Sequence, residues 1–126
     1  MKITLPWPDT RLNPNNWKGQ HWGVTSKLRS QEKEAAFWRS RDVVGRTDSR
    51  TVALLCSNPL RVDITFNAPN KRKRDLDNLL SALKPSLDGI ALSLGIDDER
   101  FQLISLRRVF VHGRSGSVDV ELAVIA

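Results

Sequence analysis

Hydrophobic and polar residues alternate in two segments of the chain. Near the start, Ile3 and Leu5 alternate with Lys2 and Thr4, and prolines at positions 6 and 8 end the pattern. In the segment 60–67, LRVDITFN, four hydrophobic residues alternate with four polar ones, the clearest alternation in the chain. Successive side chains of a strand point to opposite faces of a sheet. Both segments therefore predict β-strands with one buried face.

The segment 75–94 has the spacing of an amphipathic helix. At about 100° per residue, six hydrophobic residues fall on one stripe: Leu76, Leu80, Leu83, Leu87, Ile90 and Leu94. Gly95 follows the last of them and is a typical end of a helix. Pro85 lies inside the segment and predicts a kink, because an interior proline removes one hydrogen bond of the helix.

The remaining segments have weaker or shorter patterns. A helix is predicted from a cap at Thr25 or Ser26 to about Val44, where Gly45 would end it. The segment 45–59 then reads as a connection with a small hydrophobic patch, VALLC, at positions 52–56. Near the end of the chain, the segments 101–112 and 117–125 predict two strands joined as a hairpin by the turn GRSG.

The order of these elements is β-α-β-α-β-β, without an internal repeat or an evident linker. Strands and helices in this order favour an α+β fold of two layers, with the helices packed on one face of a mixed sheet. We therefore expect a single domain over residues 1–126.

Charge and composition restrict the possible functions. The chain has 20 Lys and Arg against 14 Asp and Glu, a formal net charge of +6, which favours a polyanionic partner such as nucleic acid. No hydrophobic run approaches the roughly 18 residues of a membrane-spanning helix, and the start lacks the hydrophobic region of a signal peptide. Cys56 is the only cysteine, so no intrachain disulfide can form. These features predict a cytoplasmic protein without a membrane partner.

The sequence KRKRDLDNLL, at positions 71–80, combines cations with a pair of carboxylates. We expect the four cations to contact phosphates, although a solvated basic loop is the alternative: Lys71, Arg72, Lys73 and Arg74. Aspartates beside them would repel phosphate unless a divalent metal ion is bound between them, and Mg²⁺ takes one or two carboxylates together with phosphate oxygens. Asp75 and Asp77 are therefore candidate metal ligands. The alternative is that one of them only caps the following helix.

Further polar residues follow on the same flank of the predicted helix. Helical geometry aligns Asp77 with Ser81, Lys84 and Asp88. Lys84 would then either approach a phosphate held at Asp77 or pair with Asp88 across one helical turn. Asp97 and Asp98 come after the helix, where acidic residues are ordinary turn formers.

The loop before the first predicted helix contains Trp17, His21 and Trp22. The tryptophans could stack on exposed bases, but core or loop-anchoring roles are the more common ones. His21, His112 and Cys56 do not have the spacing of a zinc site.

Five segments together resemble the RusA family of Holliday-junction resolvases, especially its phage-borne members. They are ITLPWP, LNPNNWKGQHW, RDLDNLL, KPSLDGI and LGIDDERF. The similarity extends from about Ile3 to Val124. It implies a small homodimeric endonuclease, encoded by a bacterium or by a phage in a bacterial host. Such an enzyme uses Mg²⁺, for which Mn²⁺ would substitute, and no small-molecule cofactor. It resolves four-way DNA junctions by paired symmetric nicks in recombination and repair.

The resemblance also assigns roles to individual residues. It implies that Asp75, Asp77 and Asp98 are the catalytic, metal-binding carboxylates. The functional lysine of the family often lies four residues after the second aspartate, where this chain has Ser81. Lys84 lies three residues later, as if three residues had been inserted, and remains near the same helix face about 4.5 Å further along the axis. We expect Lys84 to be the catalytic lysine.

Two other functions remain open from the sequence. The chain could be a non-catalytic protein that binds branched DNA, in which case it would need no metal ion. It could also be a metal-dependent nuclease of other branched substrates, because selectivity for a branch depends on surface shape.

Overall fold

The computed structural model describes residues 1–16, 22–110, 113 and 115–125. The strands are β1 (Lys2–Pro6), β2 (Leu60–Ala68), β3 (Phe101–Phe110) and β4 (Ser117–Val124). The helices are α1 (Trp22–Arg46), α2 (Ser49–Ser57) and α3 (Leu76–Leu94). Three short 3₁₀ helices are η1 (Thr10–Leu12), η2 (Pro14–Asn16) and η3 (Asp98–Arg100). No helix in these described ranges is long and apolar enough to cross a membrane.

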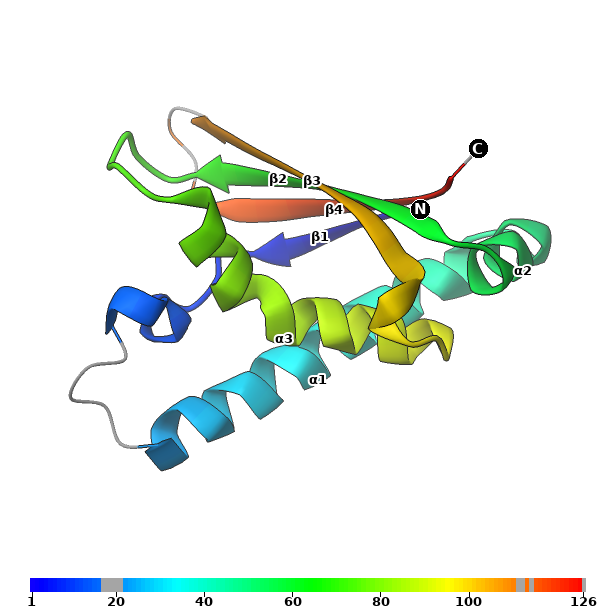
Figure 1. Ribbon diagram of the computed structural model, residues 1–126, viewed down its shortest axis with the longest axis horizontal. Helices are drawn as coiled ribbons and strands as arrows, with labels where there is room; N and C mark the ends of the chain where they lie inside the picture. Colours follow the sequence, from blue (N-terminus) through cyan, green and yellow to red (C-terminus); the bar gives the residue numbers. More distant parts are fainter. Residues whose placement is uncertain (17–21, 111–112, 114, 126) are drawn as a thin grey trace.

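The described strands form one four-stranded mixed sheet in the order β1-β4-β2-β3. β4 is antiparallel to both β1 and β2, whereas β3 is parallel to β2 and forms an edge of the sheet. Figure 1 shows α1 and α3 together on one side of this sheet. The prediction of a two-layer α+β fold, with helices on one face of a mixed sheet, is therefore confirmed.

The predicted hairpin between the last two strands is wrong. β2 lies between β3 and β4, so these two strands do not pair with each other. The reason lies in the preceding helix: a strand–helix–strand crossover through α3 places β3 parallel to β2. The chain then passes to the other side of β2, where β4 buries Val118, Val120 and Leu122 in the core.

The first helical region also differs from the prediction. α1 begins at Trp22, before the predicted caps, and continues through Gly45 to Arg46. The segment predicted as a connection contains α2, which is capped by Asp48 and buries Leu55 in the core. Helices as short as nine residues depend on tertiary packing more than on their own propensity. A pattern search along the sequence therefore overlooks them easily.

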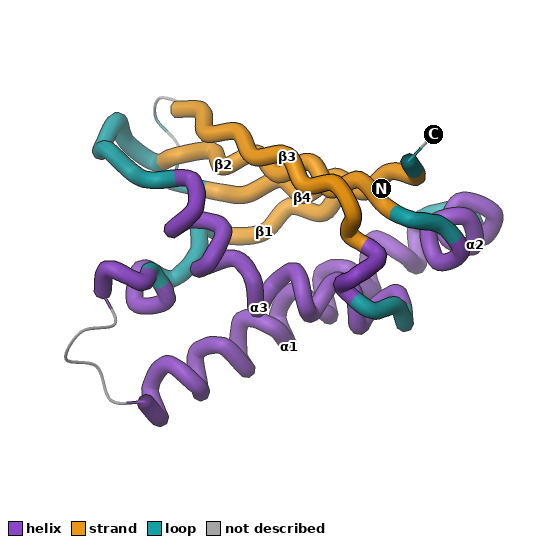
Figure 2. The backbone as a smooth tube through the Cα atoms, viewed as in Figure 1, coloured by secondary structure: helices purple, strands orange, loops and turns teal. Residues whose placement is uncertain are grey.

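α3 confirms the predicted helix and its end. Gly95 follows it in the left-handed conformation, with φ of 68°. Pro85 lies inside the helix, and Figures 1 and 2 show the first turns of α3 inclined to the later ones, as expected where a proline interrupts the hydrogen bonds. Leu79 is buried, whereas Leu76 and Leu80 of the predicted stripe are only partly buried.

Close contact between α1 and α3 depends on one glycine. A Cβ added at Gly89 would lie 2.2 Å from the carbonyl oxygen of Lys33 in α1. No side chain fits at this distance, so glycine allows the two backbones to pack directly on each other. This contact fixes α3 between α1 and the sheet, and thereby fixes the residues at both ends of α3.

Candidate functional site

The loop between β2 and α3, residues 69–75, is organised by Arg74. The side-chain oxygen of Asn70 accepts hydrogen bonds from the backbone N–H of Arg72 and from Arg74 Nη2, both at 3.0 Å. Arg74 Nη1 donates to the carbonyl oxygens of Asn70 at 3.3 Å and of Arg72 at 3.2 Å. Burial, together with the charges of Arg72 and Arg108, lowers the pKa of Arg74. Arg74 thus holds the loop together through both terminal nitrogens of its guanidinium group.

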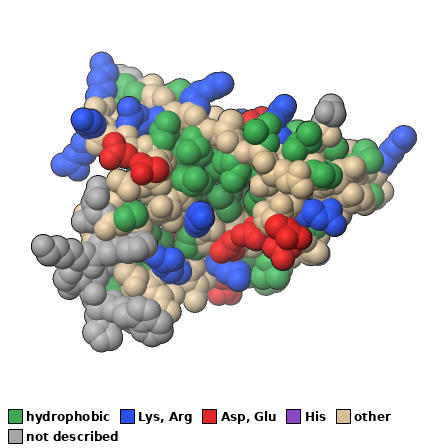
Figure 3. Space-filling view, viewed as in Figure 1, with side chains coloured by type: hydrophobic (Ala, Val, Ile, Leu, Met, Phe, Trp, Pro, Cys, Tyr) green, Lys and Arg blue, Asp and Glu red, His purple; other side chains and the backbone are tan. Residues whose placement is uncertain are grey.

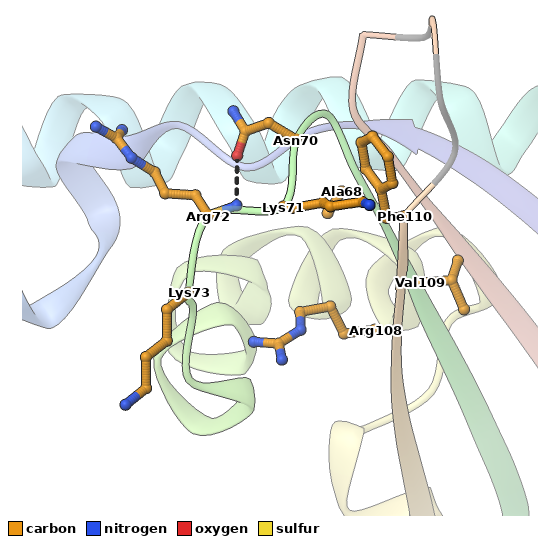
Figure 4. A pocket seen from close by; sticks show the side chains of 8 residues that line it. All are labelled: Ala68, Asn70, Lys71, Arg72, Lys73, Arg108, Val109 and Phe110. Atoms are coloured by element: carbon orange, nitrogen blue, oxygen red, sulfur yellow. Dashed lines mark hydrogen bonds between the residues drawn. The ribbon is translucent and has the colours of Figure 1, made fainter.

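The other three predicted phosphate contacts are exposed on this loop. Figure 4 shows Arg72 and Lys73 pointing away from β3, and Lys71 pointing toward it. The ammonium group of Lys71 lies 5.6 Å from the ring centroid of Phe110. The loop therefore presents three cations to solvent, and their contact with phosphate stays a prediction.

Asp75 and Asp77 lie at the start of α3. Asp75 occupies the N-cap position with extended backbone angles, but its side chain makes no capping hydrogen bond. Asp77 is in the first turn of the helix, and both side chains are exposed. Capping therefore accounts for neither carboxylate. The partial positive charge at the N-terminus of a helix stabilises the negative charge of both.

An open depression of about 510 Å³ brings these carboxylates together with cations from β3. Its lining comes from the start of α3 with the residue before it and from the second half of β3: Arg74, Asp75, Leu76, Asp77, Leu106, Arg107 and Arg108. Arg108 also donates a hydrogen bond to the carbonyl oxygen of Arg74, which ties the end of β3 to the basic loop. Carboxylates and guanidinium groups thus share one open surface, where an anion and a cation could bind side by side.

Asp98 lies at the opposite end of α3. It forms a carboxylate cluster with Asp97 and Asp88, and its pKa is raised mainly by the hydrogen bond with Asp97 and further by the charge of Asp88. These three side chains and Lys33 line a second depression of about 280 Å³. Asp88 lies eleven residues beyond Asp77, about 16 Å along a helix.

Within one chain, the structure therefore brings Asp75 and Asp77 together and leaves Asp98 apart from them. Figure 3 shows two separate acidic groups on one face, with hydrophobic and basic side chains between them. Among the residues described, no three Asp, Glu, His or Cys side chains are arranged to hold a metal ion. The two carboxylates at the start of α3 fit the one or two that Mg²⁺ takes from a protein.

Lys84 lies between the two acidic groups on the exposed side of α3. It is about 10 Å along the helix from Asp77 and about 6 Å from Asp88. The possible ion pair with Asp88 does not form in the described part of the chain, where Asp88 interacts with Asp98 instead. Ser81, the other candidate for the lysine position, is partly buried.

Sequence reasoning did not find the contribution of β3. Arg107 and Arg108 line the aspartate depression. Arg108 and Phe110 line a neighbouring hollow between the basic loop and the end of β3. The pair of arginines inside a predicted strand was a possible signal. However, the predicted hairpin gave no reason to place this strand beside the loop.

Some candidates cannot be compared with the structure. Trp17, His21 and His112 lie outside the described residues, as does the side chain of Trp22.

Two comparisons with known proteins accompany this geometry. No family model matches the chain. The chain is 38% identical over 99 residues to a protein of Xylella fastidiosa (strain Temecula1) that is described only as uncharacterized. The match covers 79% of this chain and 61% of that protein, so the chain spans about three fifths of the relative's length. The description of the relative gives no activity, and the resemblance to the RusA family stays a prediction.

Proposed function

We propose that this chain is a Mg²⁺-dependent, structure-selective endodeoxyribonuclease that resolves four-way DNA junctions in recombination and repair. The observation that carries the proposal is the depression in which Asp75 and Asp77 lie exposed beside Arg107 and Arg108. Neither carboxylate is used for capping or for an ion pair among the described residues. Because they are exposed beside cations, we infer a ligand that carries both a positive and a negative charge.

A phosphodiester with a bound divalent cation is such a ligand. Arg107, Arg108 and the exposed cations of the loop would hold the DNA backbone, because guanidinium groups bind phosphate in a bidentate manner. Asp75 and Asp77 would hold Mg²⁺, which, when bound, supplies Lewis acidity toward the phosphodiester and lowers the pKa of the attacking water. Lys84 would neutralise negative charge on the DNA further along α3. Hydrolysis of this kind needs no covalent intermediate with the protein.

The position of Asp98 favours a site formed by two chains. A homodimer would supply the two nicking centres that paired symmetric nicks require, and a two-fold interface is the commonest form of such assemblies. β3 is an edge strand of the sheet, and on the side of the helices Leu92 of α3 and Ile104 of β3 are 56% and 40% exposed. We propose that a second copy covers this surface and brings its own Asp98 toward Asp75 and Asp77.

A second candidate function follows from the same separation. If no second chain completes the site, two carboxylates are left beside a basic surface, and the chain would bind branched DNA without cutting it. Nuclease activity on other branched substrates, such as flaps or replication forks, is compatible with the same depression.

A cleavage assay distinguishes these functions. Labelled four-way junctions, flaps, forks and linear duplexes are incubated with the protein in Mg²⁺, in Mn²⁺ or in EDTA. We expect nicks in both strands of the junction with either metal ion and none in EDTA. Asp77→Asn should abolish cleavage and keep or strengthen junction binding, because it removes a negative charge near the phosphates.

The matched control is Asp42→Asn, which changes an exposed aspartate that pairs with Arg46 on α1. This variant should cut as the wild type does. Normal cleavage by Asp77→Asn would contradict the assignment of the site. Junction binding without cleavage of any substrate would identify the non-catalytic protein instead.

A further inference from the structure

A second hollow lies between the basic loop and the end of β3, next to the aspartate depression. Its volume is about 370 Å³, within the range of about 300–1,000 Å³ that is usual for small-molecule sites. The lining residues come from both elements: Ala68, Asn70, Lys71, Arg72, Lys73, Arg108, Val109 and Phe110. Arg108 lines both hollows, so a chain-like ligand could occupy the two at once.

The lining of this hollow combines cations with an aromatic ring. Four of the eight lining residues are Lys or Arg, and none is acidic. Figure 4 shows Lys71 from the loop and Arg108 from β3 extending toward each other's element, with Phe110 beside the end of Lys71. The side chain of Phe110 is 37% exposed at the end of β3. This combination suits a ligand with an anionic group and a flat ring.

The walls of the hollow are held in place before any ligand binds. Arg74 bonds to Asn70 and to the carbonyl oxygen of Arg72, and its guanidinium group lies 5.1 Å from the ring of Trp7. Arg108 bonds to the carbonyl oxygen of Arg74. These contacts join the loop to β3 and to the residue that follows β1, so less conformational entropy is lost when a ligand binds.

We propose that this hollow binds one unpaired nucleotide of the DNA strand that passes through the aspartate depression. Its base would take the place of the Lys71 ammonium on the ring of Phe110, and its phosphate would contact Lys71 and Arg108. In a duplex the faces of each base are covered by its neighbours, so only an unstacked base can reach the ring. This inference rests on the proposed function for the identity of the strand, and it names the feature of a branched substrate that the site would recognise.

Binding of single strands in EDTA tests the inference without any cleavage. The probes are a fluorescein-labelled oligothymidylate, the same oligonucleotide carrying one 2-aminopurine, and a labelled duplex of equal length. Stacking on an aromatic side chain typically strengthens binding about 5- to 150-fold per base. We therefore expect Phe110→Ala to weaken single-strand binding within this range and duplex binding less than twofold. Phe110→Trp should keep both affinities.

Two further variants distinguish a loss of stacking from misfolding and from nonspecific binding to an exposed aromatic side chain. Phe110→Leu keeps a large hydrophobic side chain, and should lose the quenching of 2-aminopurine fluorescence that the wild type and Phe110→Trp show. Trp38→Ala removes an aromatic side chain on α1 that is 62% exposed, and should leave single-strand affinity unchanged. Thermal melts confirm that each variant is folded.

The outcomes also distinguish this inference from the proposed function. If Phe110→Leu bound single strands and quenched 2-aminopurine as the wild type does, the proposed nucleotide site would be wrong, whether or not the protein cuts junctions. An equal loss of single-strand and duplex binding in Phe110→Ala would overturn it as well. Selective loss of single-strand binding by a protein that cuts no substrate would support the nucleotide site and reject the nuclease.

Discussion

At the scale of single residues, Asp75 differs from the other aspartates that precede described helices. The carboxylates of Asp9, Asp48 and Asp97 accept a backbone N–H, at 2.9, 2.9 and 3.2 Å respectively. Asp75 occupies the same position before α3 and makes no such bond. A capping side chain typically contributes about 1 kcal/mol to stability. At Asp75 this contribution is absent, and the carboxylate is left available for a ligand.

A pair of substitutions tests this difference. Asp48→Ala should lower the free energy of unfolding by about 1 kcal/mol, because it removes a working cap. Asp75→Ala should cost less, about 0.3 kcal/mol, because only the attraction of an exposed charge to the helix N-terminus is lost. Urea unfolding followed by circular dichroism measures both. An equal loss in the two variants would show that Asp75 stabilises the helix and would weaken its assignment as a ligand.

The sequence predicted half of the candidate site because that half is contiguous. The basic run and Asp75 and Asp77 are neighbours along the chain, so any fold that begins a helix there presents them together. Arg108 and Phe110 reach the site only through the pairing of β3 with β2, which no local pattern reveals. For Asp98 the reverse is true. The resemblance grouped it with Asp75 and Asp77, but in the structure it lies beyond the C-terminal end of α3, far from them.

At the scale of elements, long and strongly periodic segments were predicted well and the others were not. β2 buries each of its inward residues, and α3 ends at Gly95 as predicted. α2 was missed because its hydrophobic residues are consecutive rather than spaced along one face. The pairing of β3 was wrong because the pattern of this strand fits a hairpin with β4 as well as a crossover from β2. Which of them forms depends on how α3 packs, a property of the whole fold.

The packing of α1 on α3 gives a prediction at this scale. Gly89→Ala would place a Cβ against the carbonyl oxygen of Lys33 and 3.1 Å from the backbone nitrogen of Phe37. The two helices would have to separate, and overpacking of this kind typically costs about 1–3 kcal/mol. We expect a corresponding fall in the urea midpoint of unfolding.

Gly45→Ala is the matched control for this prediction. An added Cβ meets nothing within 4 Å there, and the residue lies in the last turn of α1. Alanine should stabilise this helix by about 0.5–1 kcal/mol. Similar midpoints for the two variants would mean that the helices tolerate a wider separation, and that Gly89 does not fix the position of α3.

At the scale of the whole molecule, the distribution of charge and hydrophobic surface has a consequence for assembly. The two acidic groups lie at opposite ends of α3, with exposed hydrophobic residues of α3 and β3 on the same face. A two-fold axis through the surface between them would exchange the two ends. Asp98 of one chain would then approach Asp75 and Asp77 of the other. The same rotation would place two nicking centres and two basic loops around one junction.

Mixed dimers test this arrangement. Asp77→Asn and Asp98→Asn chains, each inactive alone, are co-expressed with different affinity tags, and the heterodimer is purified by both tags. If the site is shared, one of its two centres contains both substitutions and the other contains none. We therefore expect the heterodimer to recover nicking of one junction strand per encounter, measured on a junction labelled on each strand in turn.

A heterodimer of wild type with the Asp77→Asn, Asp98→Asn double variant should be inactive, because each of its centres then carries one substitution. If each site instead lay within one chain, the first heterodimer would be inactive and the second would nick one strand. These opposite outcomes decide whether Asp98 acts across the dimer. Recovery of no protein that carries both tags would reject the dimer itself.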